Sequence, residues 1–192
     1  MTNSMIVAAR AGDSIPSQVA IEMIFMSTLP LESSYGKHKV MEIFSECVAA
    51  YELKIGCSYS LFENNRPMAY AFVFDGFNTD DSAPHLHTLS VYPSKMKQGY
   101  GSKLLIEILS RTNNIGLTLE CSLDSAGFFM KHDFEARNEE INGSHLAMFT
   151  ELARHRPLFQ MPKLTQEAYE RYFEMYYKTR DSLIAKKMIR FD

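Results

Sequence analysis

The sequence predicts an α/β (α+β) fold, in which a mixed, mostly antiparallel and twisted sheet of about seven strands is flanked by helices and followed by a C-terminal helical extension. Short runs rich in aromatic and β-branched residues alternate along the chain with longer segments whose apolar residues recur at helical spacing. Turn residues separate two pairs of neighbouring strands, which predicts antiparallel hairpins. A strand, a helix and a further strand in the middle of the chain predict one parallel pair, joined by a right-handed crossover.

The predicted elements follow one another with mostly short connections. Strands are expected at residues 5–9, 54–62, 68–74, 85–91, 117–121, 135–141 and 145–151. Helices are expected up to about residue 26 after a cap at Ser14 or Ser17, and at residues 36–51, 99–111, 125–132 and 166–189. Pro16 fits the first turn of the first helix. The turns at Asn64-Asn65 and Asn142-Gly143 suit hairpins, because asparagine and glycine tolerate positive φ.

The segment from residue 85 to residue 102 carries the strongest chemical signal. Alternation along the strand places His85 and His87 on one face, together with Leu89 and Val91. A glycine-rich turn, Gln-Gly-Tyr-Gly-Ser at residues 98–102, then opens a helix. Backbone N–H groups converge at such a helix start, and the missing side chains let a phosphate approach them. The segment therefore predicts a phosphate-bearing ligand beside two histidines that carry protons near neutral pH.

Two familiar phosphate-binding loops do not match this turn. The dinucleotide fingerprint requires a third glycine at residue 104, where the chain has leucine. The nucleotide triphosphate loop requires Gly-Lys-Ser or Gly-Lys-Thr, and neither tripeptide follows the glycines. A bare Gly-x-Gly before a helix also fits a tight turn with nothing bound, so the spacing alone leaves both interpretations open.

The run from Leu89 to Leu105 resembles the cofactor-binding motif of the GCN5-related N-acetyltransferase (GNAT) superfamily. It contains Val-x-Pro, then Gln-Gly-x-Gly-Ser and an apolar helix. The preceding pattern, His-Leu-His-x-Leu-x-Val, is similar to the arylalkylamine N-acetyltransferases. Residues 121–134, which end in Phe-Phe-Met-Lys-His-Asp-Phe, and residues 9–13 resemble two further blocks of the family. The likeness therefore covers roughly residues 4–150.

This resemblance implies that acetyl-CoA is the co-substrate and that no metal is needed. The glycine loop would hold the pyrophosphate with its main-chain N–H groups, and the strand before it would offer main-chain groups to the pantetheine arm and the thioester. The implied cofactor-binding residues are Leu89, Ser90, Val91, Lys97, Gln98, Gly99, Tyr100, Gly101, Ser102 and Phe129.

Three positions depart from the family pattern. Met96 stands where arginine or glutamine is common, and Lys95 or Lys97 would then supply the positive charge. Asp133 replaces a glycine near the end of the third block. Phe129 occupies the position where many members carry a tyrosine that protonates the departing thiolate. Because phenylalanine has no proton to give, water or a neighbouring hydroxyl would have to take that role.

The two strand histidines are predicted to share the role of general base. An amine with a pKa near that of lysine, ~10.4, is neutral in only about one part in 10³ at pH 7, and only the neutral amine attacks a thioester. An imidazole accepts the proton directly or through a water, and we assign this catalytic role to His85 and His87. Two alternatives stay open: hydrogen-bonded strand histidines without chemistry, and zinc ligation by His-x-His. The remaining histidines are expected to be surface or structural: His38, His132, His145 and His155.

Composition sets the outer bounds. The chain has 192 residues, 46% hydrophobic and 22% charged, which is enough for one domain with a full core. A net charge of −3 argues against a nucleic-acid partner. No membrane-length apolar run and no secretion signal are seen, so we expect a cytoplasmic protein without a membrane partner. Cys47, Cys57 and Cys121 are expected to be buried, reduced thiols.

The acetyl acceptor is less constrained. The resemblance implies a small-molecule primary amine of the arylalkylamine or polyamine type. The candidate walls of an apolar acceptor pocket are Tyr59, Phe72, Phe74 and Phe77. Two alternatives are a protein N-terminus or lysine as the acceptor, and a non-catalytic module that binds acyl-CoA.

We expect an acetyltransferase domain at residues 1–155 and a helical extension at residues 156–192. Thr165 is a candidate N-cap for the last helix. An aromatic stripe follows at Tyr169, Tyr172, Phe173 and Tyr176. The stripe predicts that the helix packs on its own domain, and it leaves open a homodimer contact or a wall of the acceptor pocket.

Overall fold

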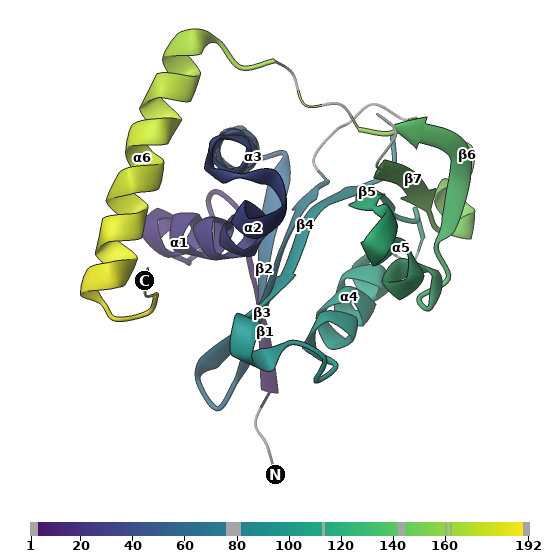
Figure 1. Cartoon of the computed structure of the whole chain (residues 1–192), viewed down its shortest axis with the longest axis horizontal. Coiled ribbons are helices and arrows are strands. Elements are labelled where there is room, and N and C mark those ends of the chain that lie inside the picture. The colour runs from purple at the N-terminus through teal and green to yellow at the C-terminus, as the bar shows by residue number, and fades with distance from the viewer. Residues whose placement is uncertain are drawn as a thin grey trace.

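The structure is a computed structural model that describes residues 4–75, 82–112, 114–141, 145–159, 161 and 163–189. Within these residues, seven strands form one sheet in the order β1-β2-β3-β4-β5-β7-β6 (Figure 1). The strands are β1 (Ser4–Ala9), β2 (Gly56–Glu63), β3 (Arg66–Phe74), β4 (His85–Val91), β5 (Thr118–Ser122), β6 (Glu135–Ile141) and β7 (His145–Phe149). Neighbouring strands are antiparallel except for β4 and β5, so the predicted fold class is confirmed.

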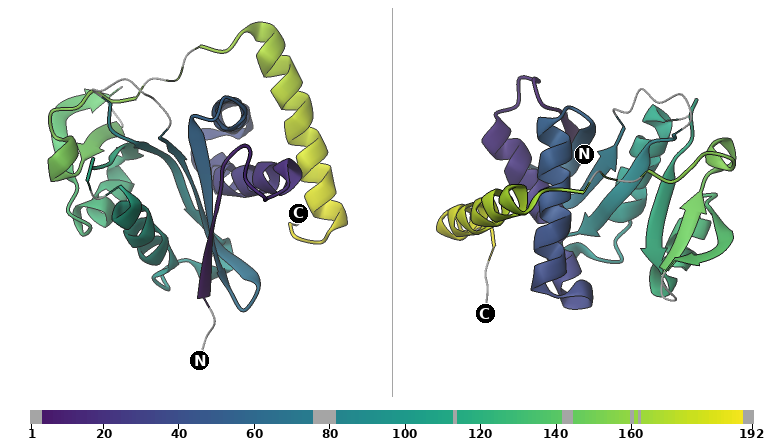
Figure 2. Two further views of the ribbon diagram at one scale, coloured as in Figure 1. Left: turned by 180° about the vertical axis from the view of Figure 1, so that it is seen from behind. Right: turned by 90° about the horizontal axis from the view of Figure 1, so that it is seen from above.

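Helices cover both faces of the sheet (Figures 1 and 2). The helices are α1 (Ser17–Thr28), α2 (Glu32–Tyr35), α3 (Lys37–Glu52), α4 (Tyr100–Arg111), α5 (Leu123–Met130) and α6 (Gln166–Ala185). Helices α1, α2, α3 and α6 lie on one side, and α4 and α5 lie on the other. Each side has its own apolar core, so the sheet separates two packed layers.

The parallel strands β4 and β5 separate soon after they begin. Their register contains two pairs in the described residues, His85 with Thr118 and Leu86 with Leu119. Strand β4 continues to Val91 without a β5 partner, and α4 forms the crossover between the two strands. The two strands diverge toward their C-terminal ends (Figure 1). It leaves main-chain groups of β4 facing the gap between the strands.

The β2–β3 hairpin forms at the expected turn. Asn64 and Asn65 have φ values of 51° and 62°, and Glu63 pairs with Arg66 across the turn. Asparagine adopts this backbone conformation more readily than most residues, which explains why it marks the hairpin. The other predicted turn, Asn142-Gly143, lies outside the described residues.

Two details near the N-terminus differ from the sequence prediction. Neither Ser14 nor Ser17 caps α1; Pro16 is the N-cap residue, and no side chain accepts a hydrogen bond there. The chain also forms a 3₁₀ turn at Leu29–Leu31 and then the one-turn helix α2, neither of which was predicted. These two short elements bring residues 29–35 to the gap between β4 and β5.

The C-terminal helix packs on its own chain, as its aromatic stripe predicts. Thr165 caps α6 by accepting a hydrogen bond from the N–H of Ala168 at 3.2 Å. The buried ring of Tyr176 lies 4.8 Å from Phe25 and 5.4 Å from Phe44, between ring centroids. The helix ends at Ala185, four residues before the predicted end at residue 189. Among the described residues, no helix is long and apolar enough to cross a membrane.

Candidate active site

The glycine loop presents unpaired N–H groups at the start of α4. Gly99 has φ 85° and precedes the helix as its N-cap, without a side-chain cap. The N–H of Lys103 donates to the carbonyl of Gly99 at 3.0 Å, so the N–H groups of Tyr100, Gly101 and Ser102 precede this bond. A twelve-residue helix also places a partial positive charge at this end. The loop therefore has the geometry of an anion site.

A groove of about 640 Å³ lies over this helix start. It is lined by Pro30, Leu31, Leu89, Ser90, Val91, Lys95, Met96, Lys97, Gly99, Tyr100, Gly101, Ser102, Ser125, Phe128 and Phe129. Nine of the ten cofactor-binding residues predicted from the sequence are among them. The exception is Gln98, whose side-chain amide instead donates to the carbonyl of Ser94 at 3.2 Å and so braces the turn.

Gly101 packs closely against β4 and α5. A Cβ atom at this position would lie 3.3 Å from Cγ2 of Val91 and 3.6 Å from Cζ of Phe128. The first distance is tighter than most Cβ contacts, so even a methyl group at residue 101 would require Val91 to move by a few tenths of an ångström, and a larger side chain would press on both neighbours.

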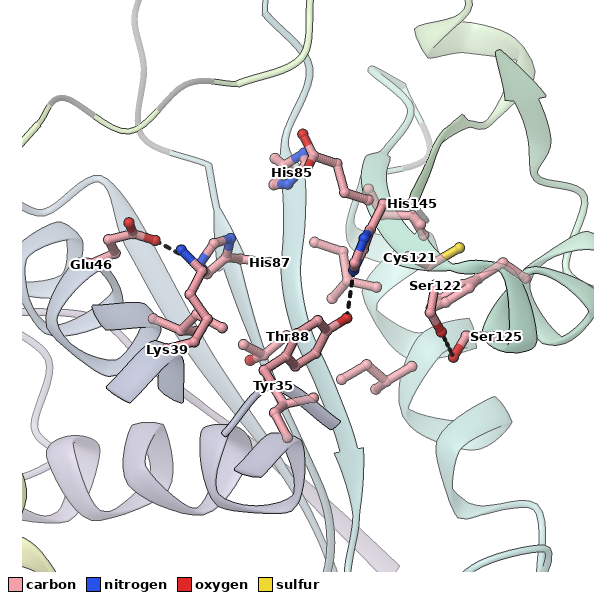
Figure 3. Close-up of a pocket in the computed structure, with 17 residues that line it drawn as sticks. Tyr35, Lys39, Glu46, His85, His87, Thr88, Cys121, Ser122, Ser125 and His145 are labelled. Atoms are coloured by element: carbon pink, nitrogen blue, oxygen red, sulfur yellow. Dashed lines mark hydrogen bonds and ion pairs between the residues drawn. The ribbon is translucent and has the colours of Figure 1, made fainter. Parts of the chain in front are cut away.

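A second hollow of about 330 Å³ adjoins the groove where β4 and β5 diverge (Figure 3). It is lined by Leu31, Tyr35, Lys39, Ile43, Glu46, His85, Leu86, His87, Thr88, Leu89, Leu119, Glu120, Cys121, Ser122, Ser125, Phe129 and His145. We call it the acceptor pocket. Leu31, Leu89, Ser125 and Phe129 line both the pocket and the groove. No described residue after His145 lines either, so α6 is not a wall of the pocket.

Both predicted histidines line the acceptor pocket, but β4 is not a regular strand there. Phe72 pairs with Thr88 and Val73 with Leu86, so His87 is an extra residue in a β-bulge. The bulge places both histidine rings on the α3 side, with centroids 6.1 Å apart. It also reverses the alternation beyond them: Leu89 and Val91 pack on the α4 side, contrary to the prediction.

His85 is buried and is held by a hydrogen bond at its Nδ1 atom. This atom lies 3.1 Å from Oγ1 of Thr118, and that hydroxyl donates to the carbonyl of Pro84 at 3.2 Å. The network therefore assigns the proton to Nδ1 of His85. Burial, with a smaller effect from neighbouring His87, lowers the pKa of His85 to about 3. Because a base this weak holds a proton poorly at pH 7, the structure argues against the predicted catalytic role for His85.

His87 is partly exposed to the pocket and faces a carboxylate. Its Nε2 atom lies 3.3 Å from Oε2 of Glu46 on α3, with both side chains about one-fifth exposed (Figure 3). The approach is out of line for a hydrogen bond, so the contact is an ion pair only when the imidazole is protonated. The ring also packs against Phe74, with centroids 4.6 Å apart.

Other polar residues of the pocket come from distant parts of the chain. The hydroxyl of Tyr35 lies 2.8 Å from Nε2 of His145, and their rings stack with centroids 5.5 Å apart (Figure 3). Ser122 donates to Ser125 at 3.0 Å. His145, which was expected to be surface or structural, lines the pocket and bonds to Tyr35. No motif marks Tyr35, Glu46 or His145, because their only common feature is their position in the folded chain.

Several predicted pocket walls lie elsewhere. Phe72 and Phe74 belong to the core beneath α1 and α3, and Tyr59 is buried on the α4 side. Phe77 lies outside the described residues. The three cysteines are free and buried, as expected. Within the described part of the chain, no three His, Cys, Asp or Glu side chains come together as metal ligands would.

Comparison with known proteins places this arrangement in a known fold. No family model and no curated protein matches the chain. Among solved structures, Escherichia coli ElaA matches with a TM-score of 0.58 at 15% identity, over 79% of this chain and 100% of its own. The PaiA N-acetyltransferase of Thermoplasma acidophilum, in complex with coenzyme A, gives 0.53 at 13% identity, over 76% and 98%. A GNAT family acetyltransferase from Elizabethkingia anophelis with acetyl-CoA bound gives 0.53 at 18% identity, over 78% and 99%.

The chain has the GNAT fold. At these identities the likeness concerns the fold, and the similarity to arylalkylamine N-acetyltransferases stays a prediction. In this GNAT fold, Phe129 on α5 lies at the junction between the groove and the acceptor pocket, and its side chain is almost fully buried. The ring borders both compartments, and it has no acidic proton.

Proposed function

We propose that this protein is an acetyl-CoA-dependent N-acetyltransferase whose acceptor is a primary amine of a small molecule. One observation carries the proposal: an anion-binding helix start and a histidine-bearing pocket meet where β4 and β5 separate. A thioester lying at that junction would expose its carbonyl carbon to an amine in the acceptor pocket. The amine would attack directly, without an acetylated enzyme intermediate.

The groove supplies what acetyl-CoA requires. The N–H groups of Tyr100, Gly101 and Ser102 suit the pyrophosphate, and Lys95 and Lys97 line the same groove with positive charge. The main-chain groups of β4 that have no β5 partner suit the amides of the pantetheine arm. The acetyl-CoA complex of the Elizabethkingia protein, which shares the fold, supports the same ligand class.

The pocket supplies a base for the attacking amine. In our proposal His87 accepts the proton, and the carboxylate of Glu46 stabilises the imidazolium that results. His85 stays neutral, because its pKa of about 3 keeps it unprotonated at physiological pH, and it bonds to Thr118. The two histidines predicted to share one role therefore have different roles.

The same pocket suits a small amine. Its volume of about 330 Å³ is near the lower end for ligand sites, and it offers the carboxylates of Glu46 and Glu120 for an ammonium group. Apolar side chains, among them Ile43, Leu119 and Phe129, line the rest. We propose that residues 156–192 are an extension to an acetyltransferase domain at residues 1–155, since their helix packs outside the groove and the pocket.

Thiol release from acetyl-CoA in the presence of an amine panel tests the proposal. The panel should contain arylalkylamines, polyamines, and peptides with a free N-terminus or a lysine. Turnover on a small amine is the expected result. Turnover restricted to peptides would mean that the acceptor is a protein amine and not a small molecule. Tight acetyl-CoA binding without turnover on any amine would support a non-catalytic acyl-CoA-binding module instead.

A further inference from the structure

Breaking the thioester creates a thiolate, and the acceptor pocket contains few groups able to donate a proton to it. The thiol of coenzyme A, judged from cysteine, has a pKa of about 8.5, so a donor near the sulfur speeds its departure. Phe129 provides none. The hydroxyls that line the pocket are those of Tyr35, Thr88, Ser122 and Ser125.

These hydroxyls differ in what they already do. Thr88 is buried and donates to Ser27 at 3.0 Å, so its proton is used. Ser122 and Ser125 bond to each other, and an aliphatic hydroxyl is a far weaker acid than a phenol. Tyr35 is a phenol with an ordinary pKa near 10, which is much closer to that of the thiol. It is therefore the best-matched acid among the hydroxyls that line the pocket.

The position of Tyr35 is fixed by a partner from across the gap. Helix α2 comes from the α1–α3 side of the molecule, and His145 begins strand β7 on the β5 side, so their bond spans the opening between β4 and β5 (Figures 1 and 3). Figure 3 shows the tyrosine hydroxyl directed across this opening toward His145, with Ser122 and Ser125 lying nearby on the side of α5. Leu31, one turn before Tyr35, lines both the groove and the pocket.

We propose that Tyr35, held in place by His145, protonates the coenzyme A sulfur as the thioester breaks. This inference rests on the proposed acetyl transfer. The bond between the carbonyl carbon and sulfur breaks with its electron pair going to sulfur, and the proton of the Tyr35 hydroxyl moves to that sulfur. In this step Nε2–H of His145 donates to the Tyr35 oxygen, which leaves the phenolic proton available for sulfur. Tyr35 then regains a proton from that Nε2–H, and His145 regains one from solvent. The amine's proton leaves separately through His87, so coenzyme A departs as a neutral thiol.

The surroundings keep Tyr35 protonated before the step. Burial, with a smaller contribution from the Cys121 thiol, raises the pKa of Tyr35 above its ordinary value. The titratable and charged groups that line the pocket with it are Lys39 and Glu46 of α3, His85 and His87 of β4, Glu120 and Cys121 of β5, and His145 of β7.

The pKa of the thiol of bound coenzyme A tests this contact without requiring turnover. A hydrogen bond from Tyr35 stabilises the thiolate, so Tyr35→Phe should raise that pKa by about one unit, a tenfold change in the ionisation constant. The ultraviolet absorbance of the thiolate reports it. The protein's own thiols interfere little, since Cys57 and Cys121 have pKa values of about 11 and burial raises the pKa of Cys47 well above its usual value. The matched control is Tyr177→Phe, which removes a hydroxyl on exposed α6 and should change nothing.

His145→Gln is the second variant and leaves Tyr35 itself in place. It should raise the thiol pKa by a smaller amount, because the phenol keeps its proton but loses its positioning. An unchanged thiol pKa in both variants would overturn the proposal. If the shifts occur but the wild-type protein acetylates no amine, the contact with sulfur stands and the proposed function fails.

Kinetics give an independent readout on an amine that the wild-type protein acetylates. Tyr35→Phe should lower kcat by about tenfold or more while leaving the KM for acetyl-CoA within about twofold. Adding Phe129→Tyr should restore most of the loss, because it returns a phenol to the junction from the other side. A purely structural role for Tyr35 would not be rescued in this way. Wild-type kcat in Tyr35→Phe would contradict the proposal.

Discussion

The groove and the acceptor pocket differ in how the chain builds them. Most residues of the groove come from one continuous stretch, residues 89–102, where a strand runs into a glycine turn and a helix. The pocket is assembled from α2, α3, β4, β5, α5 and β7, which are separated by up to 110 residues in the pair Tyr35–His145. The groove is thus built from residues close together in the sequence, whereas the pocket depends on packing between distant elements.

The largest expected effect breaks the groove and spares the pocket. Gly101→Val should weaken acetyl-CoA binding by about 100-fold or more, because the new side chain would press on Val91 and Phe128 and fill the space above the helix start. Isothermal titration with acetyl-CoA measures it. Met96→Ala is the control, since Met96 is half exposed at the rim and should change the affinity little. Wild-type affinity in Gly101→Val would mean that the loop has another purpose.

The next change breaks the pocket and spares the groove. His87→Gln should lower kcat by about 10²-fold near pH 7 with acetyl-CoA affinity unchanged, because it removes the base. The loss should shrink as pH rises, since more of the amine is already neutral. His85→Gln should cost much less activity. Equal losses from the two substitutions would restore the shared role that the sequence suggested.

Glu46→Gln also changes the pocket without changing the groove, and its expected effect on kcat is smaller. The amide keeps the shape of the side chain but cannot stabilise a protonated His87 by charge, so kcat at neutral pH should fall by about tenfold. The loss should disappear in the His87→Gln background, because the two residues act through one another. Full additivity of the two losses would show that Glu46 and His87 act separately.

The smallest change concerns stability rather than catalysis. The pKa of His85 is about 3 in the folded protein and about 6.5 in the unfolded chain, so the unfolded chain takes up the proton first as pH falls. The contribution of neutral His85 to the free energy of unfolding is therefore fully present above pH 6.5. It is lost as the pH falls below that value, by up to ~1.4 kcal/mol per pH unit. Urea unfolding at pH 7 and pH 5 measures this change. Between these two pH values the free energy of unfolding should fall less in His85→Gln than in the wild type. His38→Gln, on an exposed side chain, should leave the drop unchanged.

Sequence reasoning reached the groove because its signals are local. Positive φ at Gly99, the helix start and the hairpin asparagines all follow from neighbouring residues. The bulge at His87 does not, because it is set by the pairing of β4 with β3. Helix α2 is too short for a periodic apolar pattern, so Tyr35 could not be placed near His145 from the sequence. The role of His85 also depended on burial, which no spacing reveals.

One histidine that was expected to be surface or structural supports the groove. The Nε2 atom of His132, after α5, lies 2.9 Å from the hydroxyl of Ser102 in the groove. The contact orients a hydroxyl at the anion-binding helix start, so this histidine supports the groove from outside. Helix α5 and the turn after it thus contribute to both compartments, with Phe129 at their junction and His132 behind the loop.

The most direct test of the account is a crystal structure with coenzyme A bound. We predict that pyrophosphate oxygens accept hydrogen bonds from the N–H groups of Tyr100, Gly101 and Ser102, that the pantetheine arm follows the unpaired edge of β4, and that the sulfur lies beside Phe129 and faces the hydroxyl of Tyr35. Coenzyme A bound elsewhere, for instance in the cavity of about 780 Å³ between α1 and residues 187–189, would contradict the assignment of groove and pocket on which the proposed function depends.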